Sequence, residues 1–271
     1  MARLIGYMAN RADRLRDAFH QERAAITALP ADLRSAWGIG FYQGDEVLHK
    51  KQPTPDGAVQ WSAIAENVKT DCAIAHVRQA TVGGFSVDNT HPFRLRQWLF
   101  AHVGTLTAFE EIHDKLRADL PDFLRRNIRG SSDSELFFHW ILAGLHDVNQ
   151  LEALTPSPAV VMRAVAQAVD KIDGLVGAAR APSTLNMLLS NGRGMFALRH
   201  GGSFGYVERT GVADPANPDA GAGREARPGS PLLRYVMLVS GGPEVPAGYQ
   251  SLEDRQLLFV NRDLEVRVQP L

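Results

Sequence analysis

The order of the predicted secondary structure constrains this fold most, because strands come first, helices follow and strands return. Short apolar or alternating runs predict early strands at residues 4–8, 36–42, 46–49, 72–77 and 97–103. Apolar residues at helical spacing predict helices over 14–29, 109–120, 136–145 and 159–172, and a Ser132–Glu135 capping box precedes the third. Further strands are expected at 185–189, 195–199, 204–208, 235–239, 257–260 and 266–268. This order indicates an α+β fold in which sheets pack on each other and helices lie outside.

The size of the chain fits a single domain. Its 271 residues, 45% of them hydrophobic, are enough to bury a large core. Residues 211–231 are rich in glycine, proline and alanine, which predicts a flexible loop between two strands rather than a domain boundary. We therefore expect one domain over residues 1–271.

Charge and cysteine content exclude several classes of protein. Lysine and arginine total 29, aspartate and glutamate total 30, and no block of like charge occurs, which argues against nucleic-acid or acidic-membrane partners. A single cysteine excludes a disulfide framework and a cysteine-rich zinc site. The N-terminal residues lack the pattern of a secretory signal, and the most apolar stretch, 159–169, is interrupted by Arg163. A cytoplasmic protein without a membrane span is expected.

Four groups of residues stand out as motifs. They are ARLIGY at 2–7, HVRQAT at 76–81 with NTHPF at 89–93, FAHVGTL at 100–106, and SDSE at 132–135. In this order and spacing they resemble the class II glutamine amidotransferases, a branch of the N-terminal-nucleophile hydrolases, and especially the stand-alone glutaminase-domain type. WGIG at 37–40, SNG at 190–192 and FA at 196–197 also fit, so the resemblance covers most of the chain. It implies a four-layer αββα sandwich in which the first strand places residue 2 at the pocket.

The resemblance also implies a defined chemistry. In that family the cysteine at position 2 attacks the side-chain amide of glutamine, its own α-amine serves as the base, and an oxyanion hole stabilises the intermediate. The resemblance assigns the substrate α-carboxylate to Arg78 with Thr81 beside it, the oxyanion glycine to Gly104, and the α-ammonium group to Asp133. It implies glutamine or another γ-glutamyl small molecule as the ligand and brings in no cofactor. The sequence has no His/Asp/Glu cluster with metal-ligand spacing.

Two positions depart from the family pattern. Position 2 is Ala2, which has no nucleophilic atom, and the oxyanion asparagine of the usual His-Asn-Gly is Val103. Loss of one oxyanion donor alone costs about 3–4 kcal/mol of transition-state stabilisation. A substitution made to trap substrate would change the cysteine alone, so the second departure favours natural divergence into a pseudoenzyme over an engineered change.

The same residues have plainer interpretations. Considered in isolation, Arg78 would be expected to pair with a surface carboxylate. Its place in this motif, after a buried strand, favours a role in a pocket instead. Acids are favoured in a first helical turn by the helix dipole, so the ligand role of Asp133 rests on the resemblance alone. His91 and His102 are expected to be structural histidines that hydrogen-bond to backbone. Cys72, in the middle of an apolar strand, is expected to be a buried hydrophobe rather than a substitute nucleophile.

Three functions stay open. The first is a pseudoenzyme that binds glutamine, glutamate or a γ-glutamyl compound as a sensor or regulatory subunit. The second is an active amidohydrolase that uses another mechanism. The third is a protein-interaction module or regulatory subunit of a biosynthetic complex, whose old pocket is closed by Val103. Because the sequence shows no synthase half, a synthase or another protein partner fits each of them.

Overall fold

The computed structural model describes residues 2–27, 36–53, 59–78, 84–211 and 232–271. Two predictions from the sequence fall outside these ranges. Thr81 lies in 79–83, and the loop predicted over 211–231 is described only at Gly211. No helix within the described ranges is long and apolar enough to cross a membrane.

The first sheet has seven strands in the order β11-β9-β10-β1-β4-β2-β3, and its neighbouring strands are antiparallel. Its members are β1 (Arg3–Ala9), β2 (Ala36–Gln43), β3 (Glu46–Gln52), β4 (Cys72–Arg78), β9 (Phe204–Thr210), β10 (Arg234–Ser240) and β11 (Gln250–Ser251). Strands β1 and β4 pair with Leu4 opposite His76. Both are buried along their whole length, because the sheet is covered on both faces. This explains why they read in the sequence as nearly continuous apolar runs.

The second sheet has six strands in the order β13-β12-β8-β7-β6-β5, also antiparallel. Its members are β5 (Phe93–Leu95), β6 (Trp98–Thr105), β7 (Thr184–Ser190), β8 (Met195–Arg199), β12 (Gln256–Val260) and β13 (Val266–Pro270). Side chains of β6 alternate, so Ala101 packs in the core between the sheets and Phe100 packs in the core under the helices. Val103 and His102 continue this alternation to opposite faces at the end of β6.

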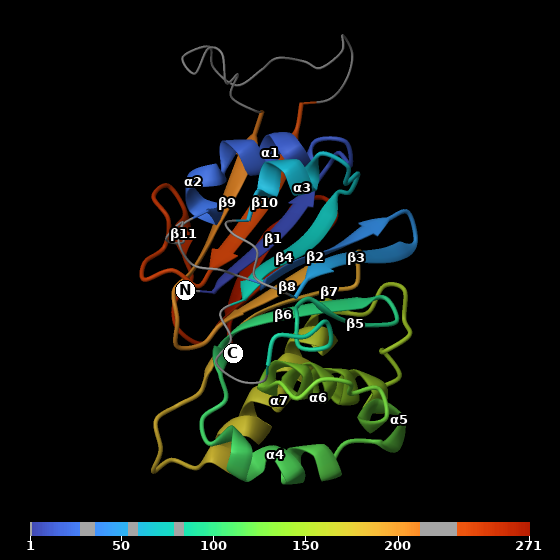
Figure 1. The fold of residues 1–271 in the computed structure, drawn as a ribbon, viewed down its shortest axis with the longest axis vertical. Helices are drawn as coiled ribbons and strands as arrows, with labels where there is room; N and C mark the ends of the chain where they lie inside the picture. Colours follow the sequence, from blue (N-terminus) through green and yellow to red (C-terminus); the bar gives the residue numbers. More distant parts are fainter. Residues whose placement is uncertain (1, 28–35, 54–58, 79–83, 212–231) are drawn as a thin grey trace.

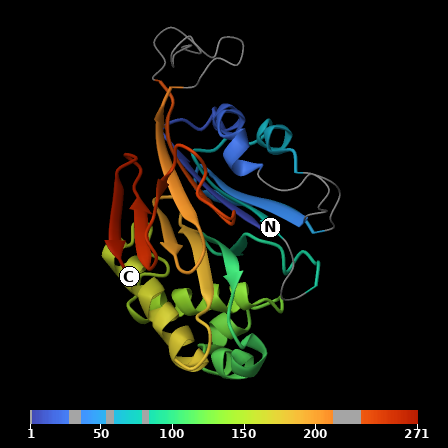
Figure 2. The same cartoon turned by 90° about the vertical axis from the view of Figure 1, so that its left-hand side faces the viewer.

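Helices cover the outer faces of the two sheets. They are α1 (Leu15–Gln21), α2 (Arg23–Ile26), α3 (Trp61–Ala65), α4 (Phe109–Ala118), α5 (Asp122–Arg125), α6 (Asp133–Asp147) and α7 (Pro158–Val176). Figures 1 and 2 show α1–α3 on the first sheet and α4–α7 on the second. One apolar core lies between the sheets, and another lies between each sheet and its helices. The predicted α+β sandwich with αββα layers is confirmed.

One predicted helix differs from the structure. The helix predicted over 14–29 is divided at Glu22 into α1 and α2, and residues 28–29 lie outside the described ranges. The Glu22 carboxylate is buried and accepts hydrogen bonds from the hydroxyls of Tyr235 and Tyr249, each at 2.9 Å. Tertiary contacts therefore override the helical spacing at this point. The elements α3, α5, β5 and β11 are too short to show a periodic pattern in the sequence.

The start of α6 follows the predicted capping box only in part. The Ser132 hydroxyl oxygen accepts a hydrogen bond from the Glu135 N–H at 3.3 Å, as expected of an N-cap. The Glu135 carboxylate accepts instead from the N–H groups of Arg129 at 3.0 Å and Gly130 at 2.7 Å, so the reciprocal half of the prediction is wrong. These contacts fix the entry to α6 and place Asp133 in its first turn.

Candidate functional site

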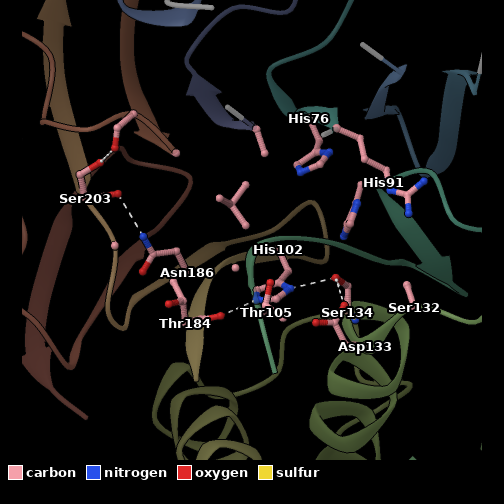
Figure 3. Close-up of a pocket in the computed structure, with 17 residues that line it drawn as sticks. His76, His91, His102, Thr105, Ser132, Asp133, Ser134, Thr184, Asn186 and Ser203 are labelled. Atoms are coloured by element: carbon pink, nitrogen blue, oxygen red, sulfur yellow. Dashed lines mark hydrogen bonds between the residues drawn. The ribbon is translucent and has the colours of Figure 1, made fainter. Parts of the chain in front are cut away.

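A cavity of about 330 Å³ lies between the ends of the two sheets and the N-terminus of α6. Its lining includes Ala2, Arg78, Val103, Gly104 and Asp133, which are the site residues predicted from the sequence apart from Thr81. The volume is in the range of small-molecule sites. Figure 3 shows the labelled residues around this cavity, which come from both sheets and from the start of α6.

The first wall comes from β1 and β4. His76 and Arg78 lie two residues apart on β4, so both side chains belong to the face that packs toward the second sheet. Ala2, just before β1, joins them in the lining. The motif at 76–81 contains both residues, but the resemblance gives a role to Arg78 and none to His76. The period-two spacing on a predicted strand is the signal that places His76 on the same face as Arg78.

The facing wall comes from β6 and β7, where Val103 lies opposite Asn186. The backbone of Gly104 has a φ of 153°, and a β-carbon there would stand 1.8 Å from the Thr184 carbonyl oxygen, so only glycine fits. The Val103 side chain lines the cavity and packs against the core between the sheets. This wall is therefore apolar at the position where the resemblance expects an amide.

Asn186 is the only side-chain amide among the described residues that line the cavity, and the protein itself occupies it. Its Nδ2 donates to the Ser203 carbonyl at 3.0 Å and to the Ser240 hydroxyl at 2.9 Å. Its Oδ1 accepts from the His200 N–H at 2.7 Å. Both N–H bonds of the amide are used, so Asn186 has no donor left for a ligand oxygen.

His102 connects β6 to the first turn of α6. Its Nε2 lies 3.0 Å from the Thr184 carbonyl oxygen, which can only accept, so we assign the proton to Nε2. Burial lowers the pKa of His102, so the ring is neutral and Nδ1 accepts from the Ser134 hydroxyl at 2.8 Å. The prediction of a structural histidine bonded to backbone is confirmed for His102.

Asp133 and Arg78 provide the opposite charges of the cavity. Asp133 is 3% exposed, and its two oxygens accept from the N–H groups of Leu106 at 2.9 Å and Ser134 at 2.8 Å. Arg78 is 4% exposed, and its Nη1 donates to the Gly84 carbonyl at 2.9 Å. Burial lowers the pKa of Arg78, and the Asp133 carboxylate opposes that shift. Among the described lining residues, these are the only arginine or lysine and the only acid.

The rings of His76 and His91 are in contact, with centroids 4.2 Å apart and planes tilted by 42°. Burial lowers the pKa of His76 to about 3 and the pKa of His91 well below its ordinary value. The Nδ1 atom of His76 and both ring nitrogens of His91 are buried, and no described residue hydrogen-bonds to them. The prediction that His91 bonds to backbone is therefore wrong: its ring contacts His76 and, at 4.6 Å between centroids, Phe93 instead.

Cys72 lies outside the lining of this cavity. It is buried in β4 with its Sγ 3.3 Å from the Ser190 hydroxyl oxygen, and burial raises its pKa to about 11. This confirms the expected buried hydrophobe. The described part of the chain holds no group of three or more histidine, cysteine, aspartate or glutamate side chains that could bind a metal ion.

Comparisons with known proteins identify relatives of this chain. The family model described as glutamine amidotransferases class-II matches residues 1–212. A candidate glutamine amidotransferase of Haemophilus influenzae is 32% identical over 209 residues, which is 73% of this chain and 62% of that protein. YafJ of Escherichia coli, also named as a candidate glutamine amidotransferase, is 31% identical over 60% of each chain. The chain thus spans about 60% of the length of these two relatives. The gamma-glutamyl-hercynylcysteine sulfoxide hydrolase of Mycobacterium tuberculosis is 29% identical over 69% of this chain and 70% of its own.

Solved structures share the fold at low sequence identity. A glutamine aminotransferase class-II domain protein from Silicibacter pomeroyi has a TM-score of 0.61 at 18% identity, covering 99% of this chain and 98% of its own. Glutamine phosphoribosylpyrophosphate amidotransferase from B. subtilis has a TM-score of 0.58 at 15% identity, covering 99% of this chain and 49% of its own. The fold agrees with the family model, which matches most of the sequence. The chain belongs to the class II glutamine amidotransferase family.

Proposed function

We propose that this protein binds glutamine or another γ-glutamyl small molecule and lacks the cysteine-based glutaminase activity of its family. It would then act in the cytoplasm as a sensor or regulatory subunit, and its partner would be a synthase or another protein. Residues 1–271 would form one domain. One observation carries the proposal: a single cavity combines the charges of Arg78 and Asp133 with the unreactive side chains of Ala2 and Val103.

The recognition half of the site rests on Arg78 and Asp133. An amino acid carries an α-carboxylate and an α-ammonium group, and these two buried side chains offer the complementary charges. Oδ2 of Asp133 accepts the Leu106 N–H and keeps a lone pair for a further donor, whereas Oδ1 faces both the N–H and the hydroxyl of Ser134. Thr81 is assigned beside Arg78 on the resemblance alone. The relative named as a gamma-glutamyl-hercynylcysteine sulfoxide hydrolase supports a γ-glutamyl ligand.

The chemical half of the site lacks the groups that the family uses. Ala2 provides a methyl group at the nucleophile position, so no acyl-enzyme can form through residue 2. Val103 offers no donor to an oxyanion, and the neighbouring Asn186 amide uses both of its N–H bonds within the protein. Gly104 is then what is left of the oxyanion hole, and the loss of the other donor costs about 3–4 kcal/mol.

Calorimetric titration tests the recognition half. We expect saturable binding of L-glutamine or a γ-glutamyl amide by the wild type and loss of binding in Arg78→Ala, because the α-carboxylate then has no cation. Arg16→Ala is the matched control, since Arg16 pairs with Glu66 at the surface and should bind like the wild type. Unchanged affinity in Arg78→Ala would overturn the assignment.

A turnover assay separates the two other functions. An active amidohydrolase would release glutamate above a heat-inactivated control. The first hydroxyl to test is Ser134, whose Oγ lies 2.8 Å from His102 Nδ1 in a nucleophile–base geometry. Glutamate release that disappears in Ser134→Ala would establish this function in place of the proposed one. A protein that binds no amino acid but retains a stable partner in a pull-down would be an interaction module.

A further inference from the structure

The two contacting histidines of the cavity carry polar atoms that no other described residue satisfies. His76 and His91 line the cavity and are 2% and 4% exposed. No described residue hydrogen-bonds to the Nδ1 atom of His76 or to either ring nitrogen of His91. A buried polar group without a partner destabilises a folded protein, so such groups in native structures call for a water or ligand partner. Figure 3 shows both rings among the side chains that line the cavity, where a ligand could reach them.

The protonation state of the pair determines what it can recognise. Burial favours the uncharged form of both rings by lowering their pKa values. A neutral imidazole presents one N–H donor and one lone-pair acceptor, so the pair offers both kinds of group to a ligand. A carboxamide carries a donor and an acceptor, whereas a carboxylate carries acceptors only.

The charge balance of the cavity leads to the same preference. Arg78 is the only lysine or arginine among the described lining residues. If Arg78 holds the α-carboxylate, a second carboxylate on the ligand would be buried without a cation, and burial of an unpaired charge is strongly unfavourable. A neutral amide avoids this penalty.

We propose that His76 and His91 recognise the side-chain end of the ligand and select a neutral carboxamide over a carboxylate. The assignment rests on the proposed function for the α-carboxylate and α-ammonium ends. It adds the groups that distinguish glutamine and γ-glutamyl amides from glutamate. The ring contacts of His91 with His76 and Phe93 hold the imidazoles in fixed orientations, as selective recognition requires.

His91→Phe tests the proposal, because it keeps an aromatic ring on Phe93 and removes both unsatisfied nitrogens. By calorimetry, we expect the wild type to bind L-glutamine about tenfold or more tightly than L-glutamate, and this ratio to fall to about threefold or less in the variant. Without ligand, the variant should melt about 2–4 °C above the wild type, because unpartnered polar atoms have been removed from the interior. His76→Phe is a second variant and should lower the same ratio.

His200→Phe is the matched control. His200 is also buried, but its Nδ1 donates to the Ser183 carbonyl at 2.9 Å, and it does not line the cavity. This variant should lose thermal stability and keep the wild-type ratio. A lower melting temperature of His91→Phe with an unchanged ratio would overturn the proposal in favour of a structural role. If the wild type binds glutamine and glutamate equally tightly, the role of the histidines is overturned and the proposed function stands. If it binds neither, both the role of the histidines and the proposed function are overturned.

Discussion

The carbonyl oxygen of His91 lies so close to Gly38 that a β-carbon built on Gly38 would stand 2.1 Å from it. Gly38 also lies opposite His76 where β2 pairs with β4. The segment that carries His91 is therefore pressed against β2 next to His76. A glycine that is not in the cavity lining thus determines how closely the two histidines approach each other.

Gly38→Ala should destabilise the protein by about 3 kcal/mol, because a β-carbon forces the backbone of β2 and residue 91 apart. Ligand binding should also weaken, since His76 and His91 move relative to each other. Urea unfolding measures the change in stability. Gly174→Ala is the control: a β-carbon there meets nothing within 4 Å in α7, and alanine should stabilise the helix by about 0.5–1 kcal/mol. A Gly38→Ala protein as stable as the wild type would contradict the observed contact.

Cys72 should be inert toward thiol reagents in the folded protein. It is buried, and its pKa of about 11 leaves a very small thiolate fraction at pH 8. Titration with an aromatic disulfide reagent should detect no thiol in the native state and one per chain after unfolding, because the chain has a single cysteine. Rapid labelling of the native protein would mean that β4 is not buried on both faces.

Mild acid should destabilise the protein before its carboxylates titrate. The pKa of His76 is about 3 in the folded protein, against about 6.5 in an unfolded chain. As the pH falls below 6.5 the unfolded state binds a proton that the folded state does not, so stability decreases. Between pH 7 and pH 5 this residue alone should lower the free energy of unfolding by about 2 kcal/mol. Burial of His91 acts in the same direction.

Urea unfolding at pH 7, 6 and 5 measures this dependence. His76→Phe should lose the contribution of about 2 kcal/mol over that range, and its stability should therefore vary less with pH than that of the wild type. A wild-type stability that stays constant from pH 7 to pH 5 would show that the histidines are not buried in neutral form.

The layers of this fold are predictable from the sequence because burial on both faces leaves a clear pattern. The apolar runs of β1, β4 and β6 and the Ser132 cap of α6 identify the elements that frame the cavity. The place of Asn186 and Ser203 in the cavity lining could not be predicted, since no local motif marks them. Only the pairing of β7 with β6 brings Asn186 beside Val103. The break at Glu22 depends on distant tyrosines, which helical periodicity cannot register.

According to the proposed function, Ala2 and Val103 replace the catalytic groups of the site, whereas Arg78 and Asp133, which recognise the ligand, are retained. The most direct test is the release of glutamate from L-glutamine by the Ala2→Cys/Val103→Asn double variant, with loss of Met1 verified by mass spectrometry so that the cysteine α-amine can act as the base. We expect release several hundredfold faster than in the Ala2→Cys single variant, which has one oxyanion donor fewer, since about 3–4 kcal/mol corresponds to a factor of about 10²–10³. The wild type should release none. A double variant that binds glutamine but releases no glutamate would contradict the claim that these two positions are the lost nucleophile and oxyanion donor.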